Sequence, residues 1–148
     1  MLGPNTTIAA DRLIVRALVS MKAQVTFESD FFKPVAGEEE KTNPGRFGQA
    51  LAEWLEVELR NRGVEVEGVI PEDFGWVVMI SRKPFMLWLG CGNTEGSTTE
   101  WSIFPAVEPS LVQRLFKRHA TEPAVQTLWE HVKAIVPTIP AAKTISWE

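Results

Sequence analysis

The sequence predicts an α+β domain in which helices cover an antiparallel sheet of about five to six strands. Short apolar or alternating runs, separated by tight polar turns, fill residues 64–104, and helical spacing of apolar residues appears both before and after them. Strands joined by tight turns have to be antiparallel, because parallel neighbours need a long crossover connection. Helices that bracket a run of strands are typical of the α+β class. We therefore expect one long helix after the first strand and two C-terminal helices packed on the sheet.

The chain of 148 residues has the length of one domain. A second methionine, Met21, stands directly before the first strand-like pattern. We therefore expect a single α+β domain over residues 21–148. Residues 1–20 are predicted to be an N-terminal extension, either partly disordered or forming a short helix around residues 8–19.

The first predicted strand covers residues 22–29, where apolar and polar side chains alternate. Residues 30–42 contain proline, glycine and an acidic triplet at 38–40, which indicates an exposed loop. Asn43 and Pro44 favour a helix start, because Asn can accept from free N–H groups and Pro fits the first helical position.

Apolar residues at helical spacing then predict a long helix over residues 44–62. Gly63 stands where a helix commonly ends on a left-handed residue. Residues 64–70 alternate strictly and predict a strand with one face in water. Two nearly apolar runs follow, at 74–81 and 85–92, and a polar break between them predicts a hairpin buried on both faces.

A turn at residues 93–98 leads into a further predicted strand at 99–104. Ser110 and Gln113 form a capping-box pattern that predicts a helix. Thr121 can cap a second helix, which Pro137 stops. Alternation at residues 143–147 predicts a final edge strand.

The charge pattern argues against a nucleic-acid partner. The net charge is −4, and residues 22–75 carry 12 acidic and 6 basic side chains, a net charge of −6. A nucleic-acid-binding protein needs a positive surface, because neutralising phosphates supplies most of its affinity. We expect instead an acidic surface that meets a basic partner.

The single cysteine, Cys91, excludes an internal disulfide and indicates a reducing compartment. Its apolar surroundings predict a small buried side chain rather than a reactive thiol. No apolar run is long enough to span a bilayer, so we expect a cytoplasmic protein with no membrane partner. His119, His131 and Cys91 lack paired metal-ligand spacing, so we expect no metal and no cofactor.

The glycine-rich stretch GCGNTEGST (90–98) does not fit a phosphate-binding loop. Such a loop needs Gly-Lys-Ser or Gly-Lys-Thr leading into a helix, whereas here a strand is predicted to follow. A dinucleotide fingerprint also opens a helix. No nucleophile elbow occurs either, so the chain carries no catalytic signature and we lean against an enzyme.

Glu72 and Asp73 are adjacent carboxylates before an apolar strand. Residues 71–74 fit a turn in which Pro takes its favoured position and Asp accepts from backbone N–H groups. The alternative is an acid pair that works on a ligand, with Trp76 as a stacking surface. The residues that we predict to bind are Glu28, Asp30, Glu72, Asp73 and Trp76.

Four stretches carry a resemblance to a known group of proteins. FESDF (27–31), TNPGRFGQALAEWL (42–55), PEDFGWVVMI (71–80) and GCGN (90–93), followed by SWE (146–148), resemble a group of small uncharacterised bacterial proteins. The resemblance covers residues 21–148 and implies a small cytosolic bacterial domain that starts at Met21. It implies no activity, cofactor or site residue.

Two functions therefore stay open at the level of sequence. The first is a binding or interaction module that engages a macromolecular, basic partner, in the way that toxin-immunity proteins neutralise their toxins; its face would include the acidic loop 38–40. The alternative is a small-molecule-binding protein or enzyme with an aromatic pocket polarised by Glu72 or Asp73. Homo-oligomer formation is left open by the sequence.

Overall fold

The computed structural model describes residues 23–108 and 121–148. The predicted N-terminal extension lies outside the described residues. So does the first of the two predicted C-terminal helices, which the capping-box pattern places after Ser110.

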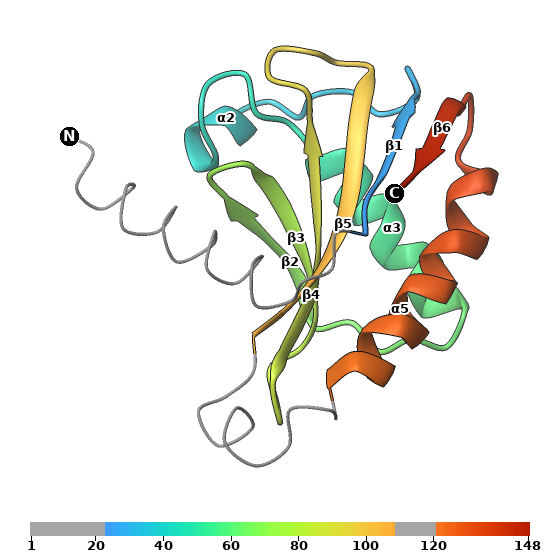
Figure 1. Ribbon diagram of the computed structural model, residues 1–148. Coiled ribbons are helices and arrows are strands. Elements are labelled where there is room, and N and C mark those ends of the chain that lie inside the picture. Colours follow the sequence, from blue (N-terminus) through green and yellow to red (C-terminus); the bar gives the residue numbers. More distant parts are fainter. Residues whose placement is uncertain (1–22, 109–120) are drawn as a thin grey trace.

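A six-stranded antiparallel sheet forms the centre of the molecule (Figure 1), which confirms the predicted α+β class. The strand order is β2-β3-β4-β5-β1-β6, so the first strand of the chain lies between β5 and the last strand. Each neighbouring pair is antiparallel. The bounds are β1 Val25–Glu28, β2 Gly68–Glu72, β3 Gly75–Ser81, β4 Met86–Asn93, β5 Glu100–Glu108 and β6 Lys143–Trp147.

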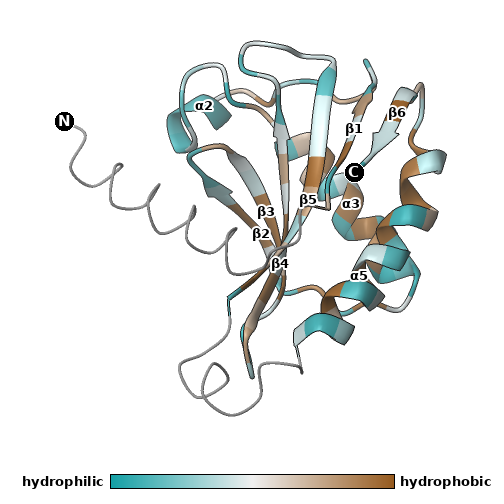
Figure 2. Ribbon diagram, in the orientation of Figure 1, coloured by the Kyte–Doolittle hydropathy of each residue, from teal (hydrophilic) through white to brown (hydrophobic). Residues whose placement is uncertain are grey.

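Two helices pack on one face of the sheet, which we call the first face. They are α3 (Gln49–Asn61), which contacts β2, β3 and β4, and α5 (Thr121–Ile135), which contacts β5 and α3. Their apolar sides turn toward the sheet (Figure 2). A short helix α2 (Glu38–Lys41), which the sequence did not predict, precedes α3, and a 3-10 turn η2 (Val136–Thr138) follows α5. Within residues 23–108 and 121–148, no helix has the length and apolar character of a membrane span.

Helix α3 forms because its apolar residues recur at helical spacing and can be buried together. Leu51, Leu55 and Leu59 are fully buried in the first-face core. The helix ends as predicted at Gly63, whose φ of 84° is left-handed. The N–H of Val64 donates to the carbonyl of Leu59 at 3.0 Å, which closes the C-terminal turn.

The predicted start of this helix at Asn43 and Pro44 is wrong. The helix begins at Gln49, and Asn43 instead donates its side-chain N–H to the carbonyl oxygen of Asp73 at 3.1 Å. The free N–H groups of Gly48 and Gln49 donate to the carboxylate of Glu38, each at 3.1 Å. A carboxylate supplied by α2 therefore replaces the local cap.

Glu38 is a buried carboxylate that joins three segments. Its Oε1 also accepts from the indole N–H of Trp76 at 3.0 Å, and its Oε2 accepts from the N–H of Val35 at 2.6 Å. Only 1% of Glu38 is exposed. The sequence predicts that the acidic triplet 38–40 lies in an exposed loop, and for Glu38 this prediction is wrong. Burial of its carboxylate is possible because hydrogen bonds from four N–H groups replace the hydrogen bonds that water would make.

The turn between β2 and β3 lies one residue later than predicted. Glu72 pairs with Gly75, so the turn residues are Asp73 and Phe74. Pro71, predicted to open the turn, lies within β2 and pairs with Trp76. Because β2 is at the sheet edge, the N–H that proline lacks is not needed by a further strand.

The second face of the sheet has an apolar half and a polar half. The apolar half, over β2 to β5, is a cluster of strand and turn side chains to which α3 and α5 contribute nothing, and we call it the apolar patch. The polar half lies over β5, β1 and β6, where Thr26 pairs with Ser102 on one side and with Ser146 on the other. The apolar patch consists of Val77, Met79, Trp88 and Ala106, with the partly buried Ile70, Phe74, Met86 and Phe104 around them.

Cys91 lies on β4 in the first-face core and is fully buried, as predicted. Burial in these apolar surroundings raises the pKa of the thiol far above its ordinary value. Backbone also crowds this position, since a Cβ at Gly48 would come within 2.6 Å of the Cys91 carbonyl oxygen.

We predict that Glu38→Ala lowers the free energy of unfolding by at least about 3 kcal/mol, because four N–H groups lose their acceptor. Urea denaturation followed by tryptophan fluorescence measures the change. The neighbouring Glu40→Ala is the control, because Glu40 is exposed, and we expect it to change stability by less than about 0.5 kcal/mol. Equal effects of the two variants would contradict the role given to Glu38.

We predict that a thiol reagent does not label Cys91 in the folded protein near neutral pH, because the thiol is buried and remains protonated. In denaturant, the same reagent should label it at the rate of an unfolded thiol. Absorbance of the released chromophore measures both rates. Fast labelling without denaturant would show that this part of the core opens.

Candidate functional site

The five residues that the sequence singled out lie toward one end of the sheet, where β1, β2 and β4 finish. They do not converge. Glu28 ends β1 and Glu72 ends β2, and three strands lie between β1 and β2. Four strand spacings amount to about 19 Å. The structure therefore divides the predicted residues into two groups, one at each side of the sheet.

The group around β2 and β3 is part of the framework. Trp76 is 4% exposed, and its N–H donates to Glu38. Asp73 sits in the β2–β3 turn, and its carbonyl accepts from Asn43. The stretches around residues 42–48, 71–76 and 90–93 thus lie side by side and are joined by hydrogen bonds. Whether Glu72, Asp73 and Trp76 bind a ligand stays a prediction.

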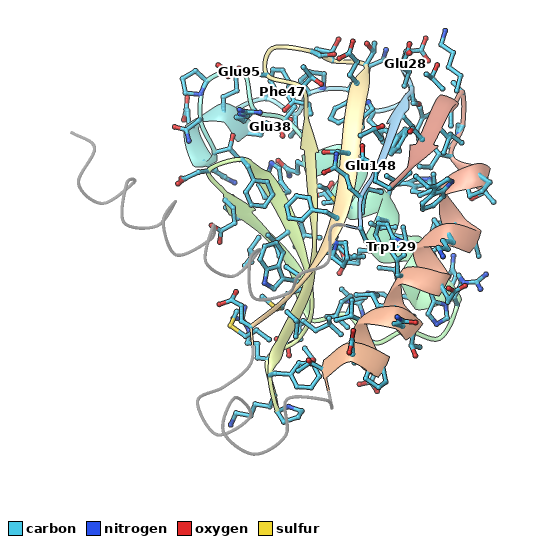
Figure 3. The ribbon with its side chains drawn as sticks, in the orientation of Figure 1. Glu28, Glu38, Phe47, Glu95, Trp129 and Glu148 are labelled. Carbon is cyan, nitrogen blue, oxygen red and sulfur yellow. The ribbon has the colours of Figure 1, made fainter. Side chains whose placement is uncertain are left out.

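The group around β1 lines cavities. Glu28 and Asp30 both line a cavity of about 550 Å³, which we call the edge cavity, and Lys143 at the start of β6 lines it too. Figure 3 shows Glu28 at the same end of the molecule as Glu38 but on the opposite side. The other residues that line the edge cavity are Ser29, Thr99, Ala141 and Ala142.

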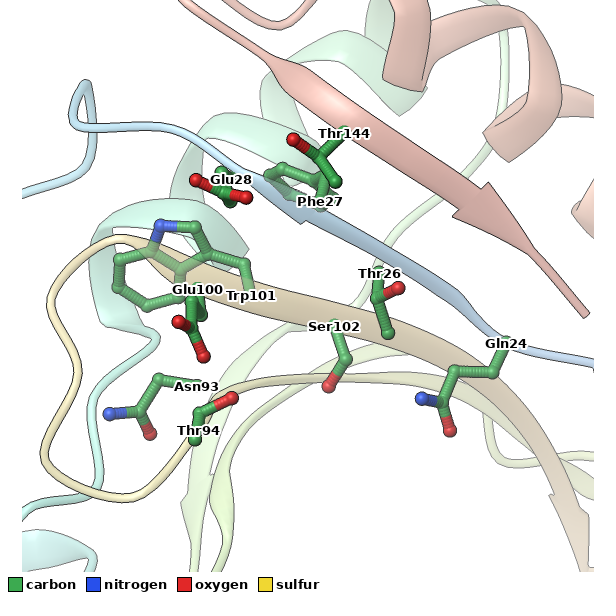
Figure 4. A pocket seen from close by; sticks show the side chains of 10 residues that line it. All are labelled: Gln24, Thr26, Phe27, Glu28, Asn93, Thr94, Glu100, Trp101, Ser102 and Thr144. Carbon is green, nitrogen blue, oxygen red and sulfur yellow. The ribbon is translucent and has the colours of Figure 1, made fainter.

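A second cavity, of about 290 Å³, lies over the polar half of the second face, and we call it the polar groove (Figure 4). Glu28 lines this cavity as well as the edge cavity, so the two adjoin at β1. Strands β1, β5 and β6 and the end of β4 supply the walls. The residues that line the polar groove are Gln24, Thr26, Phe27, Glu28, Asn93, Thr94, Glu100, Trp101, Ser102 and Thr144.

Two acidic residues occupy paired positions on neighbouring strands of the polar groove. Glu28 pairs directly with Glu100 across β1 and β5. Within residues 23–108 and 121–148, neither carboxylate has an ion pair or a hydrogen bond. No basic side chain lines this cavity. Like charges directly opposite each other on a sheet are destabilising by up to about 1 kcal/mol. Lys143 of β6 pairs with Glu28 on its other side and offsets part of this repulsion, whereas Glu100 lies at the start of β5 beyond that pair.

The groove has a rigid frame, because the buried amide of Asn93 is fully used in holding the loops beside it. Its Oδ1 accepts from the N–H of Phe47 at 3.1 Å, and its Nδ2 donates to the carbonyls of Gly45 and Ser97 at 3.0 and 2.8 Å. Across the groove, the indole N–H of Trp101 donates to the carbonyl of Ser29 at 2.9 Å. These contacts fix the backbone that carries the two carboxylates.

Hydroxyl and amide groups surround the carboxylates. Among the described residues, the side chains of Gln24, Thr26, Ser102 and Thr144 make no hydrogen bond to protein. They can therefore donate to or accept from a ligand in the polar groove. No group of three or more His, Cys, Asp and Glu side chains in the described part of the chain could hold a metal ion. The chemistry on offer is recognition of positive charge and of hydrogen-bonding groups.

A third cavity, of about 460 Å³, lies between α5, the end of β3 and the start of β4. Apolar side chains such as Ile80, Leu87 and Leu128 form most of its lining. His131 also lines it, and the Nε of Arg62 donates to the Nδ1 of His131 at 3.1 Å. Among the side chains that line it, only Thr127 and His131 are polar.

Sequence reasoning selected Glu28 and Asp30 but missed Glu100. Glu100 is an isolated acid at the start of a short strand, and nothing in its local sequence distinguishes it. Only the register of β1 against β5 places it opposite Glu28. The comparisons with known proteins add no assignment: no family model, curated protein or solved structure matches this chain.

We predict that Glu100→Gln stabilises the free protein by about 0.2–1 kcal/mol at low ionic strength, because the substitution removes the repulsion with Glu28. Added salt should shrink the difference, since exposed charges are screened. Urea denaturation at two salt concentrations measures the effect. A clear loss of stability would mean that Glu100 has a partner that supports the fold.

Proposed function

We propose that this protein is a binding module that engages a positively charged protein partner through the polar groove. The observation that carries the proposal is the Glu28–Glu100 pair, two carboxylates that line one cavity and form no ion pair with a described residue, although Lys143 of β6 pairs in register with Glu28 on its other side. A lysine or arginine side chain of a partner would remove the repulsion between them. An arginine would also match two carboxylates with its fork of N–H groups.

The size of the polar groove supports a protein partner rather than a metabolite. Its volume of about 290 Å³ lies at the lower limit of small-molecule sites, which run from about 300 to 1,000 Å³. It suits the end of one long basic side chain. Thr26, Ser102 and Gln24 would then meet the polar backbone or neighbouring side chains of the same partner.

The charge distribution supports the same reading. Residues 22–75 carry a net charge of −6. Asp30 in the adjoining edge cavity adds a third carboxylate beside the groove. Surface acids of this kind attract a basic partner over a distance and raise the association rate, although they add less to the final affinity.

The second candidate function, a small-molecule binder or enzyme with an aromatic pocket polarised by Glu72 or Asp73, has less support. Trp76 is buried, and its N–H is committed to Glu38. The edge cavity offers a better place for a small ligand. Its acids, Glu28 and Asp30, stand beside Lys143, and such opposite charges would suit a zwitterionic compound.

We predict that a synthetic peptide with alternating lysine and threonine binds the protein, and that Glu28→Gln with Glu100→Gln weakens this binding at least about tenfold. The double variant removes both carboxylate charges that line the groove and would attract a cation. Calorimetry at two salt concentrations measures affinity, and NMR shifts locate the peptide on the protein. The shifts should concentrate on β1, β5 and β6.

The matched control is Glu65→Gln with Glu53→Gln, which removes the same charge from positions that do not line the polar groove. It should leave the affinity within about twofold. A peptide with glutamate in place of lysine should not bind. An equal loss of affinity in the two double variants would show that the effect depends on net charge alone. That result would refute the polar groove as the binding site. Binding of free argininamide as tight as the peptide would favour the small-molecule function.

A further inference from the structure

The third cavity lies on the first face of the sheet, beside the two helices, and we call it the helix cavity. Its volume of about 460 Å³ falls within the range of small-molecule sites, about 300–1,000 Å³. Helix α5 packs against α3 in this part of the molecule (Figure 1). The turn after α3, the first half of α5, the end of β3 and the start of β4 form the walls.

The walls of the helix cavity are apolar because they continue the first-face core. Leu87 and Leu128 are buried members of that core, and Ile80 packs against it. The cavity has room because β3 carries one extra residue there: Met79 pairs with Trp88 and the pairing resumes only at Ser81, with Leu87. Such an irregularity bends a strand and redirects a side chain, here that of Ile80.

Hydrogen-bond donors stand at one side of these apolar walls. The Nε of Arg62 donates to the Nδ1 of His131 at 3.1 Å, and His131 lines the cavity. An imidazole that accepts at Nδ1 carries its hydrogen on Nε2, so His131 offers one N–H donor. Within residues 23–108 and 121–148, the two terminal NH2 groups of Arg62 make no hydrogen bond or ion pair. A positive charge with a fork of N–H groups therefore lies next to an apolar space.

We propose that the helix cavity binds a free carboxylic acid with a medium-length alkyl chain, such as decanoate. The chain would lie against Ile80, Leu87 and Leu128 and remove apolar surface from water. The carboxylate would accept from the terminal NH2 groups of Arg62, whose planar fork matches its two oxygens, and from the Nε2–H of His131. This site shares no residue with the polar groove, so it is independent of the function proposed above.

A series of ligands tests the proposal on the full chain, with calorimetry as the measurement. Each methylene that enters an apolar site strengthens binding about fourfold, so decanoate should bind at least about tenfold more tightly than octanoate. Decanol lacks the charge and should bind at least about tenfold more weakly than decanoate. Equal affinities of decanoate and decanol, or no binding of decanoate, would overturn the proposal. Binding to anionic lipid vesicles without binding of free decanoate would refute it as well.

Charge variants test the role of the donors. Arg62 is exposed, so Arg62→Gln should keep the fold; it should weaken decanoate binding at least about tenfold and leave decanol binding unchanged. Lys41→Gln removes the same charge from an exposed position on α2 and should change the affinity by less than about twofold. Glu28→Gln with Glu100→Gln should also leave it unchanged, which separates failure of this site from failure of the polar groove. Equal losses in Arg62→Gln and Lys41→Gln would contradict the proposal.

A pair of alanine variants on α5 tests the location. Ala124→Phe places a ring in the helix cavity and should abolish binding of both decanoate and decanol. Ala134→Phe adds the same ring at an exposed position that does not line the cavity, and it should bind both ligands normally. In the unchanged protein, decanoate should shift the methyl NMR signals of Ile80, Leu87 and Leu128. Binding that survives Ala124→Phe would overturn the assignment of the site.

Discussion

A buried carboxylate that forms no ion pair with any described residue holds the loop side of this fold in place. Glu38 receives N–H groups from its own loop, from the start of α3 and from the ring of Trp76 in β3. Removing a carboxylate from water is costly, and several charge-assisted hydrogen bonds are needed to offset the cost. The helix N-terminus contributes as well, because its free N–H groups carry partial positive charge. One side chain therefore links helix, sheet and loop.

The same loop carries the contacts that support the polar groove. The Gly45 carbonyl and the Phe47 N–H of this loop form hydrogen bonds with the side chain of Asn93 at the end of β4. Asn93 lines the groove, and Glu100 begins the next strand. The carboxylate pair thus lies beside a loop and a strand end that hydrogen bonds to Asn93 hold in place. A site built on such a support loses little conformational entropy when a ligand binds.

Local patterns in the sequence identify much of the fold. Alternation of apolar and polar residues predicts β1, because side chains two positions apart on a strand share one face. Unbroken apolar runs predict β3 and β4, because both faces of these strands are buried. Gly63 follows from the need for a left-handed residue at the end of α3. Asn43 and Pro44 mislead because their local pattern is that of a helix start, whereas the carboxylate that caps α3 comes from Glu38, ten positions before Gly48. No window of neighbouring residues contains that information.

The candidate site is less accessible to sequence reasoning than the fold. Its acids come from strands that are adjacent only because β1 inserts between β5 and β6. The strand order separates Glu28 from Glu72, which look equivalent in the sequence, and the register brings Glu28 to Glu100. A shift of one residue would have turned the two carboxylates to opposite faces. Strand order and register therefore decide which acidic residues come together in the candidate site.

The central place of β1 has a consequence for biosynthesis. The hydrogen bond from Trp101 to Ser29 joins positions 72 residues apart, and β1 finds no partner strand until β5 has been made. On a ribosome that adds about 5–20 residues per second, β1 waits for several seconds as an unpaired strand with one apolar face. During that interval it is open to chaperones, and to mispairing with a neighbouring nascent chain.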